Sequence, residues 1–126
     1  MMADALGWRP DRYDEEPAHP VLAETPTETG MGTVAAGDVI GLSSVASAWE
    51  GGVERLRLEF HAYAGAPNEY DEVIVDGPPP VHERIHGGVH GDIGTVAMVV
   101  NTASRAVGAE AGLLTMVELP PPAAVR

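Results

Sequence analysis

The stretch DVIGLSSVASAWEGGVERLRLEFHAY, residues 38–63, decides the fold. Residues 38–49 have the composition of a strand, and a Glu-Gly-Gly turn follows them. Residues 53–63 then alternate, with apolar side chains at every second position from Leu56 to Ala62 and polar ones between them. A period of two places successive side chains on opposite faces of a strand. Two such strands joined through Gly-Gly predict an antiparallel hairpin.

Shorter elements surround this hairpin. The segments DEVIVD and VHERIH, residues 71–76 and 81–86, predict a third and a fourth strand on either side of a Gly-Pro-Pro-Pro break. Residues 9–32 are polar and contain four prolines, which predicts an extended connector with a short edge strand near Val21–Glu24. A flexible linker is an equally good interpretation of that segment. Residues 2–8 are typical of a helix end that stops at Gly7.

The clearest helix covers residues 92–107, with Asp92 as the expected N-cap and Gly108 as the stop. Its side chains are apolar on nearly all sides, so we expect burial on more than one side, against the sheet and against another domain or subunit. The fold class is therefore α+β: a mostly antiparallel sheet of four or more strands with a long C-terminal helix packed on one face. Residues 1–32 are expected to belong to the same domain as residues 33–126.

Composition excludes several classes of function. The net charge of -12 argues against nucleic acids and anionic membrane surfaces as partners, because both require Lys and Arg. The chain has neither Lys nor Cys, which removes Schiff-base chemistry, disulfides and thiolate sites. The sequence also has no apolar run of the length that a transmembrane helix needs. A cytoplasmic protein is the expectation.

The segment GGVHGDIGTVAMVVNTASRAVGAEAGLLTMVELP, residues 87–120, resembles the end of a known reductase domain. The family is that of the NAD(P)-dependent dihydrodipicolinate reductase and 2,4-diaminopentanoate dehydrogenase type, and the part that matches is its C-terminal substrate and oligomerisation domain. Residues 5–24 and 59–81 resemble earlier parts of that domain. The positions that match the family pattern are Gly87, Gly88, His90, Gly91, Asp92, Val100, Asn101, Gly112, Leu113, Thr115, Met116, Leu119 and Pro120.

This resemblance is closer to the diaminopentanoate and amine dehydrogenase branch, because the chain has no His-His pair followed by Lys. It implies hydride transfer between an amine or imine and NAD(P), a small-molecule substrate, and a homodimer or higher oligomer formed through the sheet. No GxGxxG motif follows a strand, so the nucleotide-binding domain is expected to be absent and NAD(P) is not expected to bind this chain alone.

Three interpretations of the chain therefore remain open. It is a truncated and inactive part of such an enzyme, a subunit that works with a separate nucleotide-binding chain, or a non-catalytic, self-associating binding module.

Candidate site residues follow from the same patterns. His90 and Asp92 open the long helix, where free N–H groups favour a polar substrate group, and they are the predicted catalytic pair. A turn histidine that only caps the helix is the alternative. His61 and Tyr63, on the polar strand face, and Asn101, on the helix, are the predicted substrate-binding residues. The alternatives are a solvated face with ion pairs and a structural asparagine.

No metal site is expected, although His82, His86 and His90 are spaced by four. On a strand, His82 and His86 would lie about 13 Å apart, too far to share one ion. The cofactor-binding residues stay unknown from the sequence.

Overall fold

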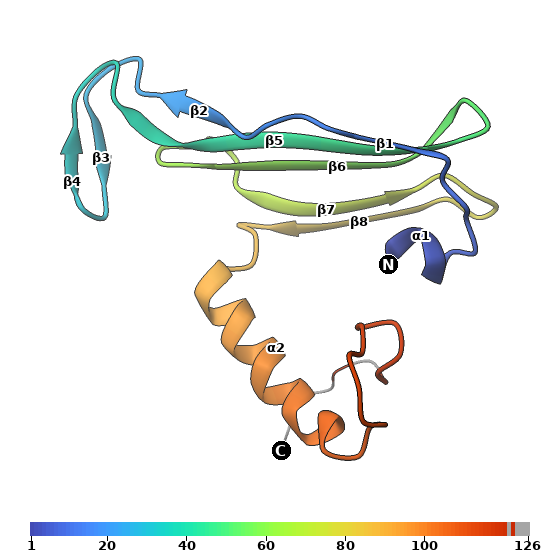
Figure 1. Ribbon diagram of the computed structural model, residues 1–126. Helices are drawn as coiled ribbons and strands as arrows, with labels where there is room; N and C mark the ends of the chain where they lie inside the picture. Colours follow the sequence, from blue (N-terminus) through green and yellow to red (C-terminus); the bar gives the residue numbers. More distant parts are fainter. Residues whose placement is uncertain (121, 123–126) are drawn as a thin grey trace. The chain divides into compact units, whose positions relative to one another are not determined.

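The structure is a computed structural model that describes residues 1–120 and 122. The chain divides into two compact units, one of Met2–Pro67 and one that starts at Asn68. Figure 1 labels the elements of both. The fold is mostly antiparallel sheet with a C-terminal helix, as the sequence predicts.

A long hairpin dominates the first unit. Strand β5, Val39–Glu50, pairs antiparallel with β6, Val53–Tyr63, which confirms both predicted strands. The turn between them is Gly51-Gly52, with φ of 57° and 81°. Two residues with positive φ match the right-handed twist of the flanking strands, and glycine adopts this conformation without steric strain.

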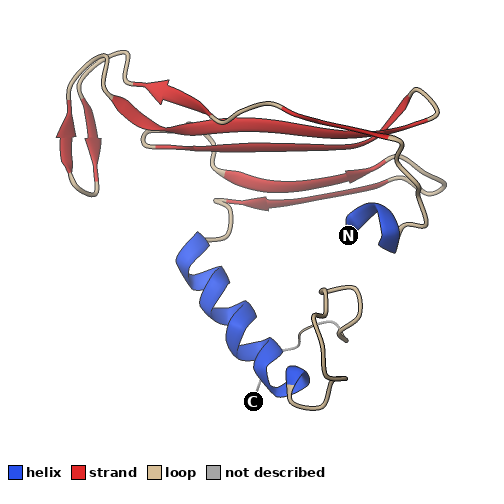
Figure 2. Ribbon diagram, viewed as in Figure 1, coloured by secondary structure: helices blue, strands red, loops and turns tan. Residues whose placement is uncertain are grey.

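Two short strands run along the other edge of β5 (Figure 2). Strands β1, Arg12–Glu15, and β2, His19–Leu22, both pair antiparallel with β5 and complete a four-stranded sheet. Edge strands suit this segment because Pro17 and Pro20 lack the N–H that an inner strand must donate. The predicted connector is therefore mostly sheet, and the flexible linker is wrong for residues 12–22.

Smaller elements complete the first unit. Helix α1 covers Met2–Ala5, and Gly7 follows it with the positive φ of 73° that is typical of the predicted helix stop. Strands β3, Thr27–Thr29, and β4, Gly32–Val34, form a two-stranded hairpin of their own. The sequence did not predict this second hairpin.

Cross-strand pairing sorts the β5–β6 side chains into two faces. Ala46 pairs with Leu58 and Ser44 with Phe60 on the apolar face, whereas Ser43 pairs with His61 on the polar face. Leu58 and Phe60 keep about half of their side-chain exposure, at 49% and 56%. Among the described residues, the buried hydrophobic ones are three alanines, namely Ala3, Ala23 and Ala48. The large apolar side chains of this sheet are therefore not covered by the unit itself.

The second unit begins with another hairpin. Strand β7, Tyr70–Val75, pairs antiparallel with β8, Val81–His86, close to the predicted bounds. These strands form a sheet of their own, so the expectation that they extend the β5–β6 sheet is wrong.

Helix α2, Gly91–Ala106, follows this hairpin. Its N-cap is His90 rather than the predicted Asp92, because the amide of Gly94 already donates to the carbonyl of His90 at 2.8 Å. None of its residues is buried, and Ile93 is 69% exposed. The predicted burial on more than one side is therefore not provided by the described part of this chain.

No helix among the described residues is long and apolar enough to cross a membrane.

Candidate functional site

The polar face of the β7–β8 hairpin gathers an ionic cluster. Glu72 accepts a hydrogen bond at Oε1 from His82 Nε2 at 2.8 Å and lies 3.4 Å from Nη1 of Arg84. The guanidinium carbon of Arg84 lies 3.6 Å from the centre of the Tyr70 ring, within cation–π range. The antiparallel register explains this grouping, because Glu72 pairs with Arg84 and the next pair on the same face contains His82.

These contacts change the acidity of Glu72. The hydrogen bond from His82 lowers the pKa of the Glu72 carboxyl below its ordinary value, and the charge of Arg84 adds to the effect. Glu72 is therefore held as the carboxylate, which is the form that accepts from both partners. Sequence reasoning missed this cluster. Its only signal is the polar residues at alternate positions of the two strands, and their pairing depends on the register.

The turn before α2 carries the predicted catalytic pair. His90 is exposed and has extended backbone angles, φ -58° and ψ 119°, and its side chain makes no capping hydrogen bond to the helix. Asp92 lies in the first helical turn. Within the described part of the chain, neither side chain has a hydrogen-bond or ion-pair partner. An imidazole and a carboxylate are thus presented together beside the free N–H groups of the helix end.

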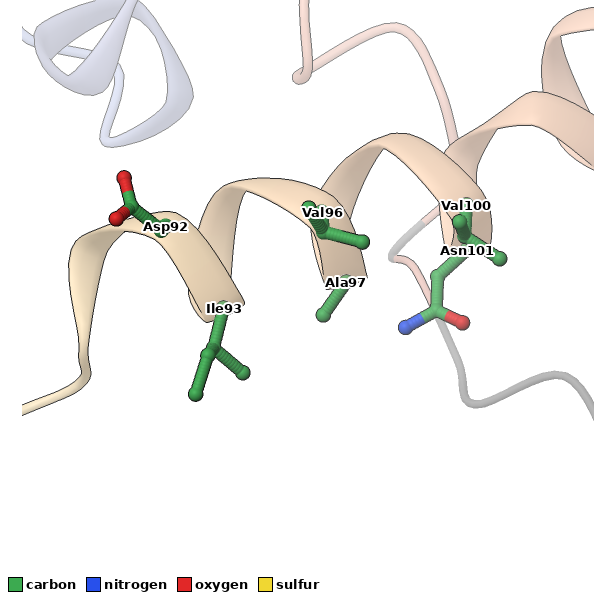
Figure 3. A pocket seen from close by; sticks show the side chains of 6 residues that line it. All are labelled: Asp92, Ile93, Val96, Ala97, Val100 and Asn101. Carbon is green, nitrogen blue, oxygen red and sulfur yellow. The ribbon is translucent and has the colours of Figure 1, made fainter.

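One side of α2 forms a shallow, open hollow (Figure 3). Ile93, Ala97 and Asn101 point to the same side, since residues four apart lie one turn above each other. The remaining lining residues are Asp92, Val96 and Val100. The hollow is apolar with one polar group at each end, so it suits a short aliphatic chain with polar ends.

The structure therefore brings three of the predicted residues together on one helix and its N-terminal turn: His90, Asp92 and Asn101. His61 and Tyr63 lie on β6 in the other unit. His61 Nε2 lies 3.7 Å from Glu59, which also accepts a hydrogen bond from Arg57. The bond from Arg57 is the main cause that lowers the pKa of Glu59. Both contacts lie along β6, whereas the solvated-face alternative expects ion pairs between strands, so the roles of His61 and Tyr63 stay predictions.

The described residues contain no group of three or more His, Cys, Asp or Glu side chains that could hold a metal ion. His82 and His86 share a face of β8, as the strand prediction requires, and His82 is bonded to Glu72 instead.

Comparison with known proteins identifies the family of the chain. Residues 1–126 match the family described as the 2,4-diaminopentanoate dehydrogenase C-terminal domain. The chain belongs to this family. A 2,4-diaminopentanoate dehydrogenase from Acetoanaerobium sticklandii is 29% identical over 130 residues, which cover 99% of this chain and 36% of that protein. The resemblance found in the sequence is thereby confirmed.

A solved structure shares the fold of this dehydrogenase domain. The amine dehydrogenase from Mycobacterium smegmatis matches with a TM-score of 0.76 and 18% identity, covering 98% of this chain and 37% of the other. The chain thus spans about a third of the length of both proteins it matches.

Dehydrogenases of this kind imply a nicotinamide cofactor, and the described residues do not fit one. A dinucleotide site lies where parallel strands end and a glycine-rich turn leads into a helix. All strand pairs described in this dehydrogenase domain are antiparallel. Gly87-Gly88 leads into α2, but the turn follows an antiparallel hairpin. These residues therefore do not form a dinucleotide-binding site of that type.

Proposed function

We propose that this chain is the substrate-binding and oligomerisation domain of an NAD(P)-dependent oxidoreductase that acts on amines or imines. In such enzymes the nicotinamide would accept the hydride from an amine or donate it to an imine, and in this proposal it is held outside residues 1–126. The family supports the oxidoreductase class, and the A. sticklandii relative suggests 2,4-diaminopentanoate as the substrate to test.

The site assignment rests on one observation: the His90 side chain makes no capping hydrogen bond to the helix. If His90 only capped the helix, its imidazole would bond to the first turn, and it makes no such bond. Asp92 lies two residues further on, in the first turn of the helix. In this proposal the Asp92 carboxylate accepts from the substrate amine, and the His90 imidazole donates to an oxygen or nitrogen of the substrate.

In this proposal the hollow on α2 binds the rest of the substrate. Its apolar middle would take the carbon chain, with Asp92 at one end of the hollow and Asn101 at the other. A short amine with polar groups at both ends fits this order of polar, apolar and polar contacts. His61 and Tyr63, on β6, stay proposed substrate-binding residues.

Titration of the ¹⁵N-labelled chain with 2,4-diaminopentanoate tests the site. We expect saturable amide shifts at residues 89–92, and Asp92→Asn should weaken the affinity about tenfold because it removes a charged acceptor. His90→Asn should weaken it as well. His86→Asn is the matched control, since His86 is an exposed histidine of the same unit outside the proposed site. Shifts that avoid residues 89–92, or that survive both substitutions, would contradict the assignment.

The cofactor half of the proposal has its own test. Calorimetric titration of the chain with NADH and with NADPH should give no micromolar binding. Micromolar affinity for either nucleotide would show that the dinucleotide site lies within these residues.

A second candidate function is a self-associating module without catalysis. Exposed apolar side chains on α2 and on the β5–β6 sheet favour it, because a contiguous apolar surface on a monomer usually marks an interface. These side chains include Leu58, Phe60, Ile93, Val96 and Val99. Association through the sheet, as a homodimer or larger oligomer, is the form that we propose for both functions.

Light scattering after size exclusion tests that association. Leu58→Glu places a charge on the apolar face of β6 and should shift an oligomer to monomer. Glu59→Gln, on the opposite face of the same strand, should leave the mass unchanged. A wild-type chain that is monomeric at all concentrations would refute association through the sheet.

A further inference from the structure

The residue immediately before His90 is tied to the start of β7. The backbone amide of Val89 donates to Oδ2 of Asp71 at 2.7 Å, across 18 positions of sequence. The neighbouring amide of Gly87 donates to the carbonyl of Glu69 at 2.7 Å. Two backbone amides of the turn, those of Gly87 and Val89, are therefore hydrogen-bonded to residues at the start of β7 or just before it.

The glycines of the turn make this approach feasible. Gly87 and Gly88 have φ of 84° and 66°, in the left-handed region that side chains other than glycine rarely adopt. A Cβ atom on Gly88 would lie 3.7 Å from Oδ2 of Asp71, so the turn passes directly over this carboxylate. The conformation of the Gly-Gly turn thus brings the Val89 amide within hydrogen-bond distance of Asp71.

Val89 is also restrained on its other side. A Cβ atom on Gly94 would lie only 2.9 Å from Cγ1 of Val89, which means that the valine side chain rests against the helix at a position without a side chain. A contact between the residue before the N-cap and the fourth helical residue fixes the angle at which a chain enters a helix. His90 follows Val89 directly, so the contacts that restrain Val89 also restrain the backbone position of His90.

We propose that Asp71 is the positioning residue of the His90 site. It holds the Val89 amide, and through it sets where the His90 imidazole and the start of α2 stand relative to the β7–β8 hairpin. This inference rests on the proposed function for the role of His90, while the bond itself stands on geometry alone.

The hairpin does not need this bond for its own stability. Six residue pairs define the β7–β8 register, from Tyr70 with His86 to Val75 with Val81. Asp71 is exposed, so its loss opens no cavity and strands no buried partner. Removal of the carboxylate should therefore release the turn and leave the hairpin folded.

Amide hydrogen exchange of the ¹⁵N-labelled chain tests the contact directly. Asp71→Ala should speed exchange at Val89 about tenfold, whereas Asp71→Asn should stay within about twofold because its amide oxygen still accepts. Asp76→Ala is the matched control, since Asp76 follows β7 and its side chain makes no hydrogen bond or ion pair within the described part of the chain. Unchanged Val89 exchange in Asp71→Ala overturns the proposal.

Titration of the same variants with 2,4-diaminopentanoate tests the consequence. Asp71→Ala should weaken the affinity about tenfold and Asp71→Asn should restore it, with thermal midpoints that match the wild type. Equal affinity for wild type and Asp71→Ala, with exchange accelerated, overturns the positioning role. If His90→Asn binds as wild type does, the proposed function of His90 fails, and the exchange result still decides whether Asp71 holds the turn.

Discussion

Among Gly→Ala substitutions in the first unit, Gly41→Ala should lower the free energy of unfolding the most. Gly41 lies in the middle of the sheet, paired with Tyr63 on β6 and with Val21 on β2. A Cβ atom there would overlap the carbonyl oxygen of Ala62 and the Cα of Tyr63, and would lie 2.5 Å from the Cβ of Tyr63. Two of these atoms belong to the backbone of β6, so a side-chain rotation cannot relieve the overlap.

The expected loss follows from what must move. Forcing a methyl group into a packed site costs about 1–3 kcal/mol. A displaced β6 also weakens at least one ladder hydrogen bond, which contributes about 1 kcal/mol. The free energy of unfolding should therefore fall by roughly 2–4 kcal/mol, and the melting temperature by roughly 10 °C or more.

Urea unfolding followed by tryptophan fluorescence measures this loss. The two tryptophans, Trp8 and Trp49, both belong to the first unit, so their emission reports on that unit. Gly30→Ala is the control, because a Cβ there meets nothing within 4 Å and its φ is not left-handed. We expect it to be neutral or to stabilise by up to about 1 kcal/mol. Equal urea midpoints for the two variants would refute the close approach of β5 and β6 at this position.

Two further outcomes are expected. The pKa of Glu72 lies below its ordinary value of 4.5 because His82 donates to it, so the stability that the carboxylate contributes is present above that pH and is lost as the pH falls through the lower, folded-state pKa. Carboxyl NMR titration should return the Glu72 midpoint toward 4.5 in His82→Leu, and an unmoved midpoint would contradict the assigned cause. Arg12→Met should lower the stability of the first unit by about 0.5–1 kcal/mol, since the Arg12 guanidinium lies 4.4 Å from the Trp49 ring centre. Asp14→Asn, which removes only the exposed ion pair of Arg12, should change it by less, and equal losses would show that the ion pair dominates.

Strands and helices whose sequence signals lie within the element itself could be predicted from the sequence. Residues 53–63 alternate with a period of two, and Gly51-Gly52 can adopt the positive φ that a tight hairpin requires, so the β5–β6 hairpin follows from a short stretch. The apolar spacing of residues 92–107 likewise predicts α2 to within one residue at each end. The family resemblance rests on the motif around His90, which is also contiguous in the chain.

Which strands pair with one another in each sheet could be seen only in the tertiary structure. Strands β1 and β2 pair with one edge of β5, although prolines and charges made residues 9–32 resemble a linker. Periodicity describes a strand and does not say which neighbour it pairs with. For the same reason the β7–β8 strands were predicted correctly and assigned to the wrong sheet.

By itself, the sequence determined the strands of the two hairpins at residues 39–63 and 70–86, the helix α2 and the family motif that opens it, because these properties depend on neighbours a few residues away. Only the tertiary structure decided that His82 bonds to Glu72 and that Asp71 reaches the amide of Val89. These partners lie 10 and 18 positions apart, and their meeting depends on the strand register and on the path of a glycine turn. A one-residue change in register would turn each of these side chains to the opposite face.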